Sequence, residues 1–396
     1  MAYYLLPIAI LMELVALTIG NMPLSAMAGL VMFVCFLAAL GQMQRYALVL
    51  LLVTIASLLS SWFGGKLGFA ELLKAASDAA FYASFIGCLG TMQCLVWRFD
   101  AVRKIHDVLL GGPVIALYPK YAATSCLLGS VLSFGTMSLL CGTLTDTLDR
   151  RGITGESRLR WVRSILISAL RGFSLVPLVA PTSVVIAILS REMPELSWSR
   201  LLPFGVVTSL LMILVGWGLE QRRFRLVSEE RHKLESLPSD TVQLVSVIGV
   251  MLAMMALLVS VTSLNVSRAA MLTVPAVTLA VMFWQDRSLR KVLSEAAHNV
   301  SSISNEMVIF SASAALSVAV AANVPADLVS SMLSDGVGTY QLAVIALLVL
   351  PLASAMGIIP ITVLSVVVGP MTCRCPLSTV YPQIGGEIAG NRSTTT

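Results

Sequence analysis

The chain has 396 residues, of which 57% are hydrophobic and 12% charged, and its formal net charge is +5 at pH 7. An average soluble domain is about 25% charged, so this composition, with apolar runs of about 18 or more residues recurring along the chain, predicts an integral membrane protein. It excludes a separate soluble domain, because the longest polar stretches are only linkers, and the positive charge is a topology signal rather than a nucleic-acid-binding patch.

Apolar segments that are long enough to cross a bilayer follow one another along the chain. The first begins without a basic region or a small-residue cleavage site, so we interpret it as a retained span rather than a signal peptide. The count is roughly ten or eleven segments in an all-α polytopic protein, because two of the stretches are unusually long. The predicted segments are 2–19, 23–41, 46–63, 77–97, 115–145, 172–190, 201–219, 239–262, 267–284, 303–323 and 340–370.

Lysine and arginine are concentrated in four linkers, near residues 98–104, 150–171, 222–233 and 287–291, and cytoplasmic loops carry most of the basic residues. All four groups lie inside only if 115–145 is a re-entrant hairpin, which enters and leaves the membrane on one side. One long tilted helix is the alternative, and it would place one arginine group outside. The hairpin predicts a cytoplasmic N-terminus and these basic residues outside: Lys66, Lys74, Arg191, Arg200 and Arg268.

A proline-containing break lies in the apolar run that follows Arg171. Each proline removes a helical N–H, and the freed backbone groups are tolerated in hydrocarbon only against protein or a water-filled cavity. Discontinuous helices of this kind form the substrate site of many secondary transporters, whereas a pair of ordinary proline kinks is the alternative. A second such stretch is Gly357–Val363, and the candidate substrate-binding residues of the two stretches are Ser174, Pro177, Pro181, Thr182, Ser183, Gly357, Pro360 and Thr362.

The two stretches resemble each other, since Pro181–Val185 reads PTSVV and Pro360–Leu364 reads PITVL. In the predicted topology they cross the membrane in opposite directions, which is the mark of an inverted repeat. We therefore predict a first transmembrane half over 1–219, a cytoplasmic linker over 220–238 and a second half over 239–396, in which no final span follows the second break.

Ionisable side chains inside spans are costly and are therefore functional candidates. Glu13 lies deepest in the first half, although a pair with a polar group on a neighbouring helix also explains it. Asp78 and Glu306 lie near predicted span ends, where snorkelling or a helix N-terminus explains them, and they are also candidates for binding a coupling cation. Arg171 begins the first break, where it suits an anionic substrate or marks the cytoplasmic side.

Enzyme signatures are largely missing, because the sequence has no phosphate-binding P-loop, no GxSxG, no HExxH and no spaced set of cysteine and histidine. Asp146 and Asp149 form a lone DxxD pair of the kind that metal-dependent prenyl-transfer enzymes use, whereas a solvated helix end is the plain alternative. The sequence therefore predicts no cofactor and no resident metal, and Na⁺ enters only as a coupling ion.

The pattern resembles the ion-transporter (arsenical-pump and divalent-anion symporter-like) superfamily of secondary carriers. The shared features are two inverted halves, a hairpin before a broken helix, and a break with small residues and proline in each half. Arg171–Val185 and Gly357–Val363 are the best local matches. The resemblance implies cation-coupled transport by an elevator-like or rocking motion, often as a homodimer.

We predict a multi-pass protein of a bacterial inner membrane that moves a small anionic solute, coupled to Na⁺ or H⁺, by alternating access around the two broken helices. One alternative is a membrane-embedded enzyme acting on a lipid-linked substrate, for which Asp146 and Asp149 would have to be essential. The other is a permease subunit of a multi-component transporter, since the chain carries no nucleotide-binding motif.

Overall fold

The structure is a computed structural model that describes residues 2–96, 116–132, 135–150, 155–192, 197–227, 241–262 and 264–323, together with 98, 99, 102 and 109. These residues form helices and connecting turns, without any strand. Seven of the helical segments they form are long and apolar enough to cross a membrane, and two shorter apolar helices lie at Leu5–Ile19 and Met22–Ala38. The chain is therefore a multi-pass helical membrane protein. The predicted segment 340–370 lies outside the described residues, so the total of ten or eleven segments stays a prediction.

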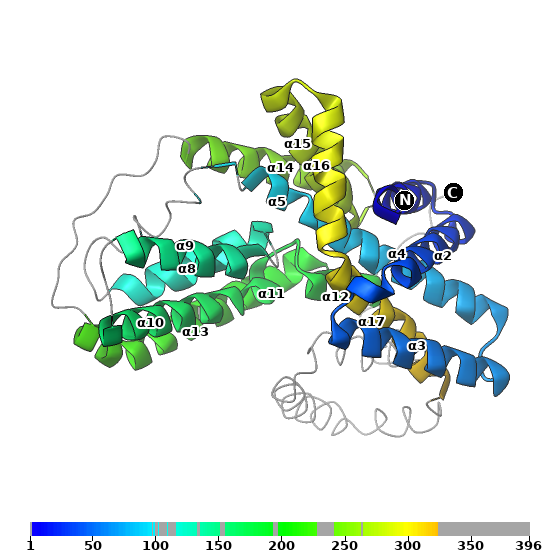
Figure 1. Ribbon diagram of the computed structural model, residues 1–396, viewed down its shortest axis with the longest axis horizontal. Coiled ribbons are helices and arrows are strands. Elements are labelled where there is room, and N and C mark those ends of the chain that lie inside the picture. The colour runs from blue at the N-terminus through cyan, green and yellow to red at the C-terminus, as the bar shows by residue number, and fades with distance from the viewer. Residues whose placement is uncertain are drawn as a thin grey trace, which may run out of the picture.

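A first group of helices combines the two ends of the described chain, as Figure 1 shows. Its first three helices follow the predicted segments closely, and its later members lie beside the N-terminal ones although about two hundred residues separate them in sequence. The group consists of α1 (Ala2–Ile19), α2 (Met22–Ala38), α3 (Arg45–Phe63), α4 (Phe69–Gly90), α5 (Met92–Val96), α14 (Thr241–Val261), α15 (Val266–Asp286), α16 (Leu289–Ser302) and α17 (Ser304–Asn323).

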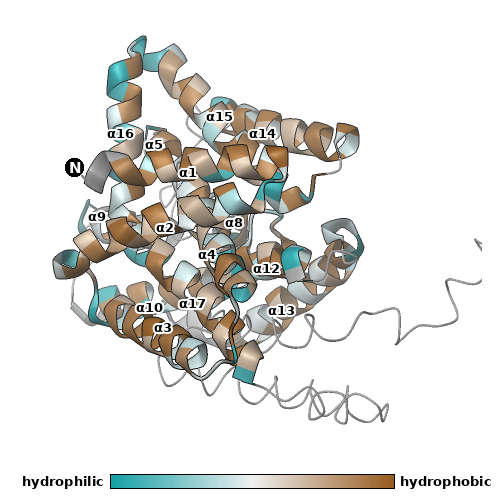
Figure 2. Ribbon diagram, turned by 90° about the vertical axis from the view of Figure 1, so that its right-hand side faces the viewer, coloured by the Kyte–Doolittle hydropathy of each residue, from teal (hydrophilic) through white to brown (hydrophobic). Residues whose placement is uncertain are grey.

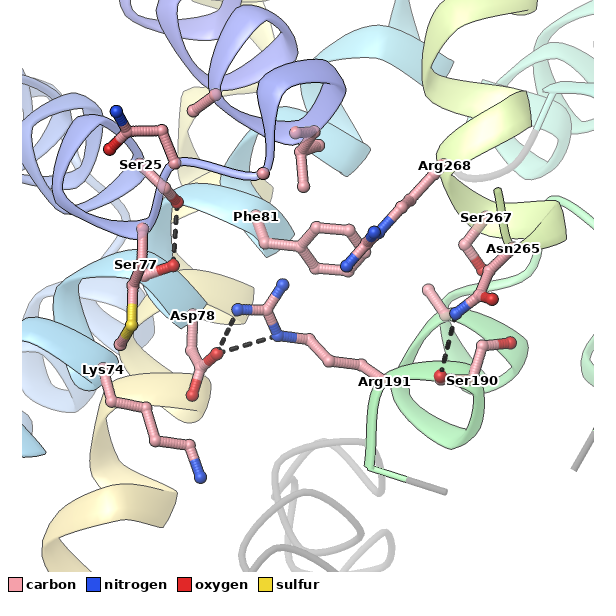
Figure 3. Close-up of a pocket in the computed structure, with 16 residues that line it drawn as sticks. Ser25, Lys74, Ser77, Asp78, Phe81, Ser190, Arg191, Asn265, Ser267 and Arg268 are labelled. Carbon is pink, nitrogen blue, oxygen red and sulfur yellow. Dashed lines mark hydrogen bonds and ion pairs between the residues drawn. The ribbon is translucent and has the colours of Figure 1, made fainter. Parts of the chain in front are cut away.

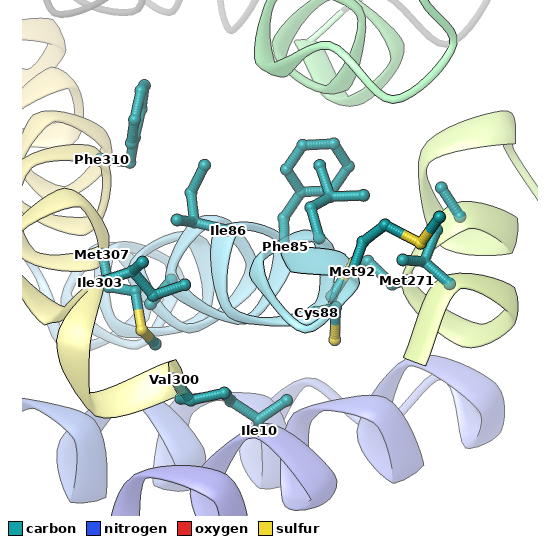
Figure 4. Packing of buried hydrophobic residues seen from close by; sticks show 14 of the residues in the cluster. Ile10, Phe85, Ile86, Cys88, Met92, Met271, Val300, Ile303, Met307 and Phe310 are labelled. Atoms are coloured by element: carbon teal, nitrogen blue, oxygen red, sulfur yellow. The ribbon is translucent and has the colours of Figure 1, made fainter. Parts of the chain in front are cut away.

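Helix α4 is the centre of this group. Every residue of α4 from Ala80 to Gly90 is buried, and α1, α2, α15 and α17 pack around the helix. Figure 4 shows Phe85 and Ile86 of α4 among Ile10, Met271 and Met307 from the surrounding helices. A helical stretch that is apolar on all sides suits such a position, because the neighbouring helices cover every face of it.

The start of α4 differs from the prediction, which placed the beginning of this span at residue 77. The helix begins at Phe69, because the backbone N–H of Gly68 donates to Oε2 of Glu71 at 2.8 Å and closes the first turn. Asp78 consequently lies well inside the helix, and its predicted place near a span end is wrong. Glu306, by contrast, lies in the first turn of α17 as predicted.

A second group of helices has its own hydrophobic cluster, which includes Tyr118, Tyr121, Leu148 and Trp161. The stretch predicted at 115–145 is two helices that pack against each other, so the alternative of one long helix is wrong. The prediction of a linker for the basic stretch before residue 171 is also wrong. This stretch forms an amphipathic helix, whose apolar face packs into the cluster. The group consists of α8 (Leu117–Leu132), α9 (Gly135–Arg150), α10 (Gly155–Phe173) and α13 (Trp198–Val227).

Between the two groups the chain is only intermittently helical. After α10 it turns at Ser174, forms the single turn α11 (Val176–Val179), turns again at Pro181 and continues as α12 (Val184–Glu192). Val184, Ala187 and Ile188 of α12 belong to the first group's hydrophobic cluster, so this segment passes from one group to the other. The second predicted break, Gly357–Val363, lies outside the described residues.

Apolar residues make up most of the helices (Figure 2), and many of their side chains are exposed. On α13 they are exposed from Phe204 to Leu219 and on α14 from Val242 to Val261, for example at Leu211 and Leu257. In water such a surface would be unfavourable, whereas in a bilayer the lipid chains cover it. The predicted division into halves at 220–238 stays a prediction, because α13 continues to Val227 and residues 228–240 are not described.

Candidate functional site

A partly open cavity of about 580 Å³ lies where α1, α2, α4, α12 and α15 meet. Its walls come from segments that are far apart in sequence, and polar and charged side chains line much of it (Figure 3). Small-molecule sites have volumes of about 300–1,000 Å³, so the cavity suits a small solute. Its polar lining residues are Asn21, Ser25, Lys74, Ser77, Asp78, Ser190, Arg191, Asn265, Ser267 and Arg268.

An ion pair crosses the cavity from α12 to α4. Arg191 donates from both Nε, at 2.8 Å, and Nη2 to the same oxygen of Asp78, Oδ1. The side chains are 21% and 7% exposed, and the guanidinium also lies over the ring of Phe81, 4.5 Å from its centroid. Asp78 therefore holds Arg191 at one edge, while Nη1 of Arg191 makes no hydrogen bond with a described residue.

A second arginine, Arg268, extends into the same space from the first turn of α15. It makes no hydrogen bond or ion pair with any residue that the structure describes. Lys74 of α4 also lines the cavity, so its charged lining residues are three cations and one carboxylate, that of Asp78. This excess of positive charge in a small cavity favours an anion.

Local structure fixes two sides of the cavity: the side that carries the two arginines and the side formed by the turn between α1 and α2. The side chain of Asn265, which precedes α15, donates to the carbonyl of Ser190 at 3.2 Å and thereby holds the end of α12 against the start of α15. Between α1 and α2 the chain turns at Gly20, whose φ of +75° is a left-handed conformation that favours glycine. Asn21 then caps α2 by accepting from the backbone N–H of Leu24 at 3.1 Å.

The third side depends on a close approach of α2 to α4. The hydroxyls of Ser25 and Ser77 are 2.8 Å apart and hydrogen-bonded. One turn further along α2, a Cβ added to Gly29 would come within 2.1 Å of the carbonyl oxygen of Ala76. Membrane helices approach each other closely through such small residues, and the approach places Ser25 and Asp78 on adjoining walls.

The predicted candidates of the first break do not line the cavity. Their hydroxyls are engaged within the protein, since Ser174 donates to the carbonyl of Arg171 at 2.7 Å, Thr182 to that of Ser130, and Ser183 accepts from the N–H of Ile186 at 3.2 Å. Pro177 and Pro181 are half-buried in the same segment. The candidates of the second break, Gly357, Pro360 and Thr362, lie outside the described residues. A substrate role for either set stays a prediction.

The remaining charged candidates are distributed over several places. Arg171 pairs with the buried Glu220 at 3.1 Å, so it does not stand free for a substrate. Asp149 of the DxxD pair is exposed and pairs with Arg158 at 2.9 Å, while the side chain of Asp146 lies outside the described part. Among the described residues no group of three or more His, Cys, Asp and Glu side chains could hold a metal ion.

Sequence reasoning missed the two arginines of the cavity as site residues. Both were predicted to lie on the outer side of the membrane, where basic residues are scarce. That scarcity was the signal that could have singled them out as functional candidates. What the sequence did not show is that Arg191 and Arg268, which are 77 positions apart, meet Asp78 in one cavity.

Comparison of the chain with protein-family models, with curated proteins and with solved structures finds no match. The cavity and its charges therefore carry the functional argument.

Proposed function

We propose that the protein is a secondary transporter that binds a small anionic solute in the cavity between α4, α12 and α15 and moves it across the membrane, coupled to Na⁺ or H⁺. The observation that carries the proposal is the pair of arginines directed into one cavity, of which Arg268 has no acidic partner among the described residues. Arg191 offers Nη1 beside it, so an oxyanion between the two would receive charge-assisted hydrogen bonds from both.

The position of Arg268 supports an anion for a second reason. A helix N-terminus is the positive end of the helix dipole, where a cation is unfavourable and an anion is favourable. Arg268 lies in the first turn of α15, so its placement does not stabilise the helix. An anion bound there would interact favourably with both the guanidinium and the helix end.

The distribution of basic residues supports an outward-facing cavity in a protein with a cytoplasmic N-terminus. Lys74, Arg191 and Arg268, which the sequence places outside, line the cavity together. Arg98 and Lys291, which it places inside, meet at the other end of α15, where both pair with Asp286. Under the positive-inside rule this polarity fits an inner membrane with the cavity open toward the outside.

The segment from Ser174 to Ser183 supports alternating access. It loses helical structure between the two groups of helices and then continues as α12, which carries Arg191. Movement of one group relative to the other at this segment would open or close the cavity, as discontinuous helices do in known carriers. The inverted repeat and the resemblance to the ion-transporter superfamily belong to the same proposal.

Binding is tested by following thermal unfolding of the purified protein during titration with sodium sulfate, phosphate or lactate at constant ionic strength. A ligand that binds only the folded state stabilises it by about 2.7 kcal/mol at a hundred times its Kd. Since a hydrogen bond to a charged group contributes about 1.5–3 kcal/mol, Arg268→Gln should raise the Kd at least about tenfold.

The matched control is Arg290→Gln, which removes one positive charge from an exposed position in the first turn of α16, just beyond the end of α15 that is far from Arg268. It should leave the Kd unchanged. Equal effects of the two variants, or no stabilisation by any of the three anions, would contradict the proposal. Uptake of the bound anion into liposomes, driven by an imposed Na⁺ or H⁺ gradient, then distinguishes a transporter from a protein that only binds.

A further inference from the structure

Glu13 is a buried carboxyl group for which the packing gives no partner. Its side chain on α1 is 0% exposed, and neither carboxyl oxygen has a hydrogen-bond partner in the structure. Ala16, Leu17 and Gly20, which line the cavity, follow it at spacings of three, four and seven residues. Residues at these spacings share one helix face, so Glu13 lies on the cavity-facing side of α1, one turn deeper than the cavity wall.

An ionised carboxylate in this position would lie away from water, and only the neighbouring Ser25 hydroxyl would be near enough to donate a hydrogen bond to it. Such burial costs several kcal/mol or more, and a buried acid avoids that cost by binding a proton. Structural packing alone does not explain a glutamate here, because an apolar side chain of similar volume would have no such cost. The neutral, protonated carboxyl is therefore the form that the resting structure accommodates.

The groups that surround Glu13 belong to the helices that enclose the cavity. They are Ser25 on α2, Asp78 and Cys88 on α4, Arg191 on α12 and Arg268 on α15. From α16, which also packs against α1, the buried side chains are apolar: Val292, Ala296, Ala297 and Val300. Asp78 is already paired with Arg191, which leaves Glu13 as the nearby carboxyl without a cation of its own.

We propose that Glu13 is the proton-binding residue that couples this carrier to H⁺, an inference that rests on the proposed function. An ionised Glu13 and a bound anion would compete for the same two arginines, and the two negative charges would repel each other. Binding of the anion therefore favours the protonated form, and proton binding in turn strengthens binding of the anion by the same factor. Solute and proton then move together, and the charge of the solute is offset by the proton.

The test is the pH dependence of anion binding by the full-length protein. Sulfate and lactate serve as probes because both stay ionised between about pH 5 and pH 9, the range in which a buried glutamate titrates. In the wild-type protein the Kd should increase about tenfold as the pH rises, a typical size for coupling between two sites. Glu13→Gln, which mimics the neutral form, should keep the tight binding of the low-pH protein at every pH.

Proton uptake gives an independent readout. At the upper end of this pH range, where Glu13 of the free protein is ionised, addition of sulfate or lactate to weakly buffered wild-type protein should raise the pH, because each bound anion brings a proton with it. Glu13→Gln should show no such change. In liposomes this variant should still exchange the anion across the membrane but should no longer accumulate it in response to a pH gradient. Glu306→Gln, which removes a different partly buried carboxyl in α17, should behave as the wild type.

The outcomes separate the two proposals. If the anions bind and Arg268→Gln weakens them, but Glu13→Gln keeps the wild-type pH profile and proton uptake, the role of Glu13 is wrong while the anion site stands. The same holds if the coupling is lost in Glu306→Gln instead, or if binding depends on Na⁺ rather than on pH. If none of the anions binds the wild-type protein at any pH, both proposals fail. Glu13→Gln should fold as well as the wild type, because the neutral group is the one that the packing accepts.

Discussion

The two ends of α15 present the same electrostatic problem, and the protein treats them differently. Arg268 lies in the first turn and Asp286 is the last residue, about 27 Å further along the axis, and each carries the charge that the helix dipole disfavours. At the far end Asp286 is compensated by Arg98 at 2.7 Å and Lys291 at 2.9 Å. At the cavity end no described residue compensates Arg268. The charge of Asp286 is explained by the stabilising ion pairs that it makes, whereas the charge of Arg268 is explained only if a bound ligand compensates it.

Breaking the ion pair of the cavity should have the largest effect on stability. Arg191→Met leaves the carboxylate of Asp78 buried and unpaired, and such losses cost about 3–5 kcal/mol. We expect a fall of about 3 kcal/mol in the free energy of unfolding, measured by chemical denaturation in detergent.

The double variant Asp78→Asn with Arg191→Met is the control, since it removes both charges. It should recover most of the lost stability, because the cost comes from the unpaired charge rather than from the missing contact. A double variant as unstable as Arg191→Met alone would show that the pair is not the cause.

The approach of α2 to α4 should come next in size. Gly29→Ala places a Cβ within 2.1 Å of the backbone carbonyl of Ala76, which is not able to rotate away. The helices must separate, and overpacking of this kind costs about 1–3 kcal/mol. Because Ser25 lies one turn away, we also expect weaker anion binding.

Gly249→Ala in α14 is the matched control, because nothing lies within 4 Å of its added Cβ. Alanine is the better helix former by roughly 0.5–1 kcal/mol, so this variant should be as stable as the wild type or slightly more stable. If both variants lose stability equally, the close approach of α2 and α4 is not what limits them.

The sequence was sufficient for most of the helices but not for the site. Segments such as α1 and α3 are predominantly apolar, so hydropathy alone marks them. Helix α10 was missed because its arginines dilute an apolar stripe that only the helical period reveals, and Trp161 and Ile165 on that stripe are buried. The start of α4 was missed because the first turns are too polar for a hydropathy signal.

The cavity depends on contacts between distant segments, which no local pattern contains. Glu13 was recognisable as an acid inside a span, and Asp78 as a candidate near one. Their relation to Arg191 and Arg268 follows from the packing of α1, α4, α12 and α15 around one space. The positive-inside rule assigns a basic residue to one side of the membrane, but only the fold shows whether that residue belongs to a site.

The smallest effect is expected at the compensated end of α15. Burial lowers the pKa of Arg98, but its hydrogen bonds to Asp286 and Glu295 outweigh this and raise the pKa overall, so the group stays charged. Arg98→Gln should lower the melting temperature less than Arg191→Met does, because its side chain and its partners are partly open to solvent, with Glu295 37% exposed. The loss should shrink at high salt, since screening already weakens exposed pairs in the wild type. Anion binding should be unchanged in this variant. A loss of binding would mean that the two ends of α15 are not independent. The uncompensated charge of Arg268 would then not be sufficient to define the anion site.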